Sequence, residues 1–149
     1  MFDALGRALL DHVWEGLTPG QRGVLGHNRV VGPANGPAWD CTMLFTSLSR
    51  ITPRTDSTGC VQFYRATFRV GFLQQVAYVD DSGRIPLATE VTEDGMQILS
   101  MVDPLRQLVE SFDYEALGVQ GRDMEGYEPL GPAGGLGGGQ WFVTFWGEA

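Results

Sequence analysis

The apolar side chains at the start of the chain recur every three or four residues. They are Phe2, Leu5, Leu9, Val13 and Leu17. This spacing places them on one stripe, so it predicts an amphipathic helix with Asp3 near its start and Thr18-Pro19-Gly20 at its end. From residue 18 to residue 40 glycine and proline recur without any apolar period, which predicts a long loop arm that either engages a partner or is a loose tether.

The next patterned residues predict a β-hairpin. Residues 41–51 are rich in β-branched and aromatic residues, and residues 53–59 carry a dense turn signal. The returning strand alternates, with one face formed by Tyr64, Ala66, Phe68, Val70 and Phe72 and the other by Arg65, Thr67 and Arg69. We expect the first face to be core and the second to be wet or an interface. A loop centred near residue 55 would place Cys41 opposite Val70 rather than Cys60, which disfavours a disulfide.

A second helix is predicted after an acidic turn at residues 80–84. Thr92 is its expected cap, Glu93 and Asp94 fall in its first turn, and Val91 is placed to contact Met96. Its apolar stripe comprises Leu99, Val102, Leu105, Val109 and Phe112. Pro104 either kinks this helix or starts a fresh one that Asp103 caps.

Residues 118–140 are polar and then glycine-rich, and they predict a second loop arm rather than a stable element. We expect both arms, at about 18–40 and 118–140, to be ordered mainly by contacts between subunits. Residues 141–146 are apolar on both faces and predict a strand that is covered on two sides. The chain is therefore expected to be one α+β domain of residues 1–149. Its small, mixed, mainly antiparallel sheet would carry two helices on one face and the two long arms.

Charge is divided unevenly along the chain. All ten basic residues are arginine, and the net charge of −8 argues against general nucleic-acid binding. Residues 1–79 hold seven Arg and five acids, whereas residues 80–128 hold three Arg and twelve acids. This asymmetry is either solvated surface charge or the complement needed for head-to-tail contact between copies.

Residues that could carry chemistry are few, and their spacing predicts no catalytic, cofactor or metal site. His12 and His27 have no ligand-like neighbours in the sequence, and the run GGLGGG lacks the Lys-Ser/Thr of a phosphate loop. Cys41 and Cys60 are interpreted as small, buried, reduced thiols. We expect a protein that is not an enzyme and that has neither a signal peptide nor a membrane span.

The order helix, strand, strand, helix, glycine-rich segment and terminal strand resembles the tail-terminator proteins of long-tailed, siphovirus-like bacteriophages. The stretch FRVGFLQQVAYVDDSGRIPLATEVTEDGMQILSMVDPLRQLVESF, together with Cys41 and Cys60, is similar to proteins of phages with actinobacterial hosts. Those relatives often carry a cysteine late in the second strand, where this chain has Gln74-Gln75.

The resemblance implies a virion protein of the tail or neck, made in the host cytoplasm, that forms a homo-oligomeric ring of six. Its partners would be copies of itself, the tail tube protein and a head-completion or connector protein. Genome DNA would pass through the ring, without sequence-specific binding and without a membrane partner.

In such a ring we expect Arg65 and Arg69 to meet acidic groups of residues 80–128 in the next subunit, Asp80 and Asp81 included. The apolar terminal strand with Trp146 would supply affinity. The alternatives are another head-to-tail connector or stopper component, or a small ligand-binding α+β domain, which a deep pocket with convergent polar groups would favour.

Overall fold

The computed structural model describes residues 2–32, 40–55, 57–78 and 82–148. The elements, in chain order, are α1 (Phe2–Gly16), α2 (Pro19–Val24), β1 (Arg29–Val31), β2 (Met43–Thr55), β3 (Val61–Gln75), α3 (Ala88–Glu110), the 3-10 turn η1 (Glu115–Leu117), β4 (Gly121–Ala133) and β5 (Leu136–Glu148). The strands form one five-stranded sheet in the order β1-β2-β3-β5-β4. Only β1 and β2 run parallel, so the α+β class and the mainly antiparallel sheet are confirmed.

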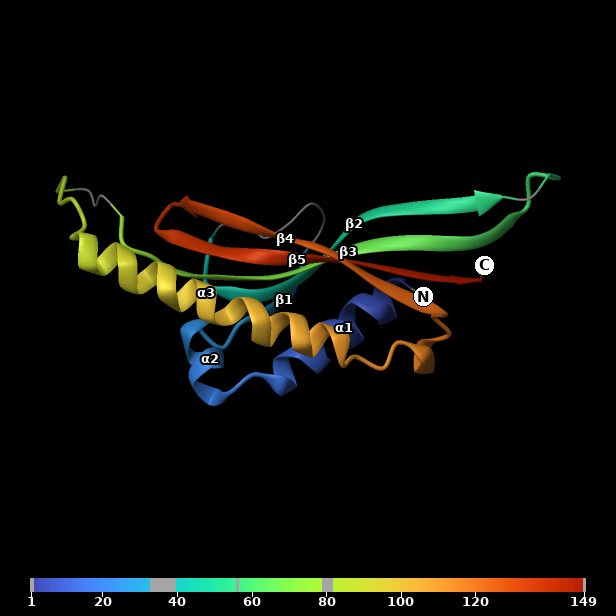
Figure 1. The fold of residues 1–149 in the computed structure, drawn as a ribbon, viewed down its shortest axis with the longest axis horizontal. Helices are drawn as coiled ribbons and strands as arrows, with labels where there is room; N and C mark the ends of the chain where they lie inside the picture. The colour runs from blue at the N-terminus through green and yellow to red at the C-terminus, as the bar shows by residue number, and fades with distance from the viewer. Residues whose placement is uncertain (1, 33–39, 56, 79–81, 149) are drawn as a thin grey trace.

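Helices α1 and α3 pack on one face of this sheet (Figure 1). The Thr46 hydroxyl of β2 donates to the Gly6 carbonyl of α1 over 3.1 Å, and Trp141 Nε1 of β5 donates to the Val102 carbonyl of α3 over 2.9 Å. The main core lies between these layers and includes Leu5, Leu9, Val13, Phe68, Val70, Phe72, Leu105, Val109, Val143 and Phe145. The predicted apolar stripe of α1 and the predicted core face of β3 therefore meet in the same core.

The opposite face of the sheet, called the outer face below, is divided in two. At the end near β1 it carries a smaller buried cluster of Met43, Phe45, Leu73 and Leu136. Further along it presents Arg65, Thr67 and Arg69 of β3 beside Phe142, Thr144 and Trp146 of β5. No helix of the described residues packs on this second part, where the two arginines, Phe142 and Trp146 are partly exposed and the threonines are buried.

The β2–β3 hairpin is longer than the sequence predicts. Thr46, not Cys41, lies opposite Val70, so the predicted register is wrong. Pro53 and Arg54, interpreted as turn residues, belong to β2 and pair with Tyr64 and Phe63. Proline is tolerated there because β1 pairs only with residues 44–46 and the rest of β2 forms a sheet edge.

The predicted arm at residues 118–140 is wrong, because most of it forms the hairpin β4–β5. Gly134 and Gly135 have φ of 57° and 75°, the positive values that a two-residue type I′ turn requires. β5 lies between β3 and β4, so the strand predicted at residues 141–146 is paired on both edges. This segment is ordered by its own subunit, contrary to the expectation that contacts between subunits order it.

The predicted arm at residues 18–40 is also partly structured. Thr18 and Gln21 form a capping box, in which Gln21 N donates to the Thr18 hydroxyl over 3.1 Å and Thr18 N donates to Gln21 Oε1 over 2.8 Å. Pro19 occupies the start of α2, where its missing N–H costs nothing. β1 follows, and only residues 33–39 of the predicted arm lie outside the described residues.

Helix α3 begins at Ala88, so Thr92 is not its cap. The helix runs through Pro104 to Glu110, which rules out a fresh start at Asp103. Leu105 and Val109 are buried as predicted, but Leu99 is 63% exposed. Val91 and Met96, which were predicted to contact each other, are both exposed as well. None of residues 88–100 is buried, because this half of α3 extends toward one end of the molecule with little sheet above it (Figure 1).

The outer half of the β2–β3 hairpin projects at the other end (Figure 1). Residues 50–55 and 61–62 that the structure describes are all exposed. No helix of the described chain is both long enough and apolar enough to cross a membrane.

Candidate subunit interface

Three of the five residues proposed for subunit contact lie together on the outer face. Arg65 pairs directly with Trp146, and Arg69 pairs directly with Phe142, across the β3–β5 ladder. Directly opposed residues of an antiparallel pair project to the same face, so the two arginines and Trp146 form one surface. The other two, Asp80 and Asp81, lie outside the described residues.

Arg65 is held by its own subunit. Its guanidinium lies 5.4 Å from the centre of the Trp146 ring and 3.9 Å from the Asp123 carboxylate of β4. A cation–π contact at an exposed site contributes about 0.5–1 kcal/mol, and an exposed ion pair contributes about 0–1 kcal/mol. These contacts therefore orient the side chain and leave it able to meet a second surface.

Arg69 lies deeper on the same face, with its guanidinium 5.1 Å from the centre of the Phe142 ring. Its Nε is buried and has no hydrogen-bond partner within the described chain. A buried donor that lacks an acceptor destabilises a protein, typically by about 1–3 kcal/mol. An acceptor brought by another molecule would remove that penalty.

Between the two arginines lies Thr67, which the sequence placed on this face, together with two polar partners that the sequence analysis missed, Thr144 and Glu125. The Thr67 and Thr144 hydroxyls lie 2.8 Å apart, and the Thr144 hydroxyl donates to Glu125 Oε1 over 2.6 Å. Glu125 and Asp123 belong to β4, which the sequence analysis took for a loop. The Gly134-Gly135 pair between two polar runs was the available signal for this hairpin.

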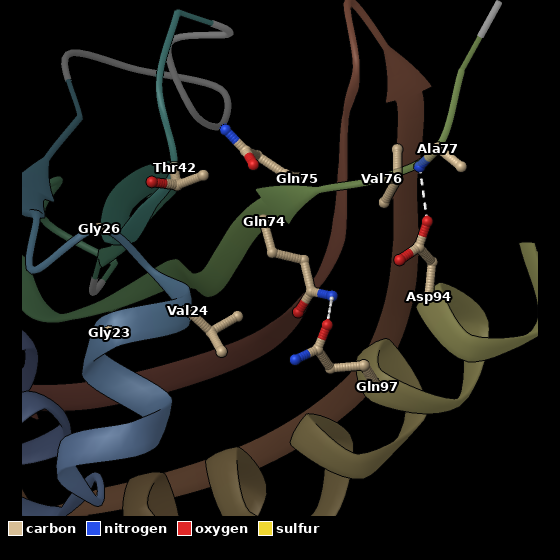
Figure 2. A pocket seen from close by; sticks show the side chains of 10 residues that line it. All are labelled: Gly23, Val24, Gly26, Thr42, Gln74, Gln75, Val76, Ala77, Asp94 and Gln97. Atoms are coloured by element: carbon tan, nitrogen blue, oxygen red, sulfur yellow. Dashed lines mark hydrogen bonds between the residues drawn. The ribbon is translucent and has the colours of Figure 1, made fainter. Parts of the chain in front are cut away.

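A groove lies at the end of the molecule from which α3 extends. Figure 2 shows α2 on one side of it, α3 on the other and the end of β3 between them. Its polar part encloses about 580 Å³ and is lined by Gly26, Thr42, Gln74, Asp94 and Gln97, among others. Its apolar part encloses about 240 Å³ and includes Val91, Ile98, Pro129 and Leu130. Val76, Ala77 and Asp94 line both parts, so they are continuous, and we call them together the α3 groove.

Two polar side chains define the chemistry of the α3 groove. Asp94 Oδ2 accepts a hydrogen bond from Ala77 N over 2.5 Å, and Gln74 Nε2 donates to Gln97 Oε1 over 3.1 Å (Figure 2). Gln74 is 1% exposed, and its Oε1 has no hydrogen-bond partner in the part of the chain that the structure describes. A groove lined by a carboxylate and by an unsatisfied acceptor suits a group that donates hydrogen bonds, above all a cation.

The histidines and cysteines occupy separate places. His12 Nε2 lies 2.9 Å from the Ser111 hydroxyl, and His27 has a positive φ of 55° in the turn after α2. Within the described ranges no three His, Cys, Asp or Glu side chains are arranged to hold a metal ion. Cys41 and Cys60 are exposed thiols, so the prediction that they are buried is wrong. That both are reduced remains a prediction, and thiol counting after unfolding should find two.

Cys41 should react slowly with thiolate-directed reagents. Loss of hydration around its sulfur and, next, the negative charge of Asp40 raise the pKa of this thiol. Because the reactive species is the thiolate, a raised pKa lowers its fraction at any pH below that pKa. At pH 8 we expect iodoacetamide to alkylate Cys41 more slowly in the folded protein than in the unfolded chain. The substitution Asp40→Asn should raise the folded-state rate; an unchanged rate would contradict the role of the Asp40 charge.

In comparisons with known proteins, no protein-family model matches the sequence, and no curated protein is detectably similar to it.

Proposed function

We propose that this chain is a structural, non-enzymatic protein of a bacteriophage neck that forms a ring, ends the tail tube and joins it to head-completion proteins. The observation that carries the proposal is the outer face, where arginines stacked on aromatic rings lie on a sheet whose helices pack on the opposite side. Arg69 Nε on this face lacks an acceptor within the described chain. A second copy with an acidic surface would supply that acceptor.

Ring closure follows from unlike surfaces on identical subunits. A surface that complements a different surface on the next copy makes a heterologous contact, and such contacts close into a ring when the rotation permits. The sequence divides charge unevenly, because residues 1–79 carry a charge of +2 and residues 80–128 a charge of −9, although Asp123 and Glu125 lie beside the outer-face residues of β3 and β5. Charge would fix the orientation of the subunits, and apolar contacts would provide most of the affinity.

Mass measurement and electron microscopy test this function. The purified protein should have the mass of a closed oligomer, expected to be six copies, either alone or when it is added to polymerising tail tubes of the same phage. It should form a ring at one end of each tube and stop its growth. Assembled tails that carry no ring of this protein would refute the proposal.

The double substitution Arg65→Glu and Arg69→Glu should weaken assembly and reduce its dependence on salt. Both side chains lie at the surface proposed for contact, and their local contacts to Trp146 and Phe142 stabilise the monomer only modestly. Sedimentation across a salt series measures the effect, and urea unfolding checks the monomer. Arg7→Glu, on an exposed part of α1, is the matched control. Equal assembly of the double variant and the control would count against this surface.

The α3 groove favours the other class of function, a small ligand-binding domain, because polar groups converge in it. A ligand-binding function requires a monomer that binds a small molecule. A monomeric mass at every concentration, together with a ligand retained on purification, would favour it over the ring.

A further inference from the structure

We infer that the α3 groove receives the projecting β2–β3 hairpin of a neighbouring copy of this chain, with Arg54 placed against Asp94 and Gln74. This inference rests on the proposed ring and specifies how one subunit holds the next.

Exposed apolar side chains are concentrated at the two ends of the molecule. Nine large apolar side chains are exposed in the described chain, and eight of them lie either between residues 78 and 99 or on the hairpin. The first set comprises Tyr78, Ile85, Leu87, Val91, Met96 and Leu99, and the second comprises Ile51 and Val61. Exposed apolar surface gathered in this way marks protein contacts. Because the two sets lie at opposite ends, a contact between them joins two copies head to tail (Figure 1).

The stripe of α3 that points toward the layer of the sheet continues beyond the core. Leu87, Val91 and Ile98 repeat at the spacing of Leu105 and Val109, yet Leu87 is 62% exposed and Val91 54% exposed. Val91 and Ile98 form one wall of the apolar part of the groove, and Pro129 and Leu130 belong to the other. A helix stripe of this kind is stabilised when an apolar partner covers it.

The hairpin offers chemistry that matches the groove. Arg54 lies directly opposite Phe63, so a guanidinium and an aromatic ring share one face, and this face continues into Arg65 and the outer face. The hairpin sequence from residue 50 to residue 63 contains two arginines, Arg50 and Arg54, and one acid. Residues 82–100 contain three acids and one arginine. Charge therefore favours the hairpin as occupant over an acidic or neutral segment.

Gln74 gives a local reason for a cationic occupant. Its buried Oε1 lacks a donor among the described residues, and the Asp94 carboxylate of α3 lines the same groove. An arginine guanidinium has five N–H donors in a planar fork, so it is suited to an amide oxygen and to a carboxylate, while Phe63 would cover the apolar part.

The two cysteines provide a direct test. Cys60 immediately precedes β3 at the hairpin, and Cys41 lines a hollow that shares Thr42, Gln75 and Val76 with the α3 groove. If the hairpin docks, Cys60 of one subunit lies near Cys41 of the next. A short bismaleimide added to the assembled wild-type protein should yield Cys41–Cys60 cross-links between subunits, identified by peptide mass. Cys41→Ser and Cys60→Ser should each abolish them.

Substitutions test the groove separately. Arg54→Glu should lower the association constant about tenfold or more, since it places two like charges together. Adding Asp94→Arg should restore much of the loss, whereas Arg7→Glu should change nothing. Gly95→Leu should also weaken assembly, because a Cβ at Gly95 meets no atom within 4 Å and the larger side chain fills the groove without disturbing the monomer.

The outcomes separate this inference from the ring itself. Rings that assemble without Cys41–Cys60 cross-links, and that tolerate Arg54→Glu and Gly95→Leu, would overturn hairpin docking and leave the proposed function standing. A chain that stays monomeric alone and forms no ring on tail tubes would overturn both. Rings with these cross-links, weakened by either substitution, would establish the contact.

Discussion

Gly138→Ala should destabilise the fold by about 3 kcal/mol or more, the upper range for overpacking a core. A Cβ at Gly138 would lie 1.9 Å from the Phe72 carbonyl oxygen and 2.9 Å from its carbon, both backbone atoms of the adjacent strand β3. A flexible side chain would move aside, but a paired backbone cannot move without breaking the ladder. Glycine inside a strand marks such close approach of backbones.

Urea unfolding of Gly138→Ala and of a matched control, Gly126→Ala, measures this effect. Gly126 lies in the edge strand β4, its φ is not in the left-handed region, and a Cβ there meets no atom within 4 Å. Replacing glycine by alanine at a compatible position stabilises a protein by about 0.4–1 kcal/mol, chiefly through the unfolded chain. Similar unfolding midpoints for the two variants would show that β5 does not approach β3 as closely as the structure has it.

The glycines of β5 explain why the sequence analysis mistook residues 118–140 for an arm. Apolar periodicity reports side chains, and Gly137, Gly138 and Gly139 have none, although all three are buried in β5. β4 lies at the sheet edge and is nowhere buried after Gly121, so it carries no apolar alternation either. Strand order here is set by backbone pairing and by the turn at Gly134-Gly135.

Where one face of an element is buried along its whole length, the pattern predicted the structure well. The stripe of α1 and the alternation of Ala66, Phe68 and Val70 both proved to be core. The shared face of Arg65, Arg69 and Trp146 follows from that alternation and from strand pairing. The α3 groove was not foreseen, because its walls come from α2, α3, β3 and the β4–β5 hairpin, which only the tertiary fold brings together.

The buried stripe predicted for α3 was wrong at one position. Leu99 and Leu105 were assigned to one buried stripe, but Leu105 is fully buried and Leu99 is 63% exposed. The two are six residues apart, which on a helix of 3.6 residues per turn places them on different sides. The difference in their surroundings gives a pair of substitutions with identical chemistry and unequal cost.

Leu105→Ala should therefore lower the free energy of unfolding by about 2–5 kcal/mol, the cost of lost apolar burial and of the cavity left behind. Leu99→Ala in the isolated monomer should change it by no more than about 0.5 kcal/mol, because an exposed leucine makes few contacts and alanine favours the helix. Chemical denaturation at a concentration below assembly measures both. Equal losses would mean that Leu99 is covered within one subunit. Because Leu99 does not line the α3 groove, this result tests the fold of the monomer and is independent of hairpin docking.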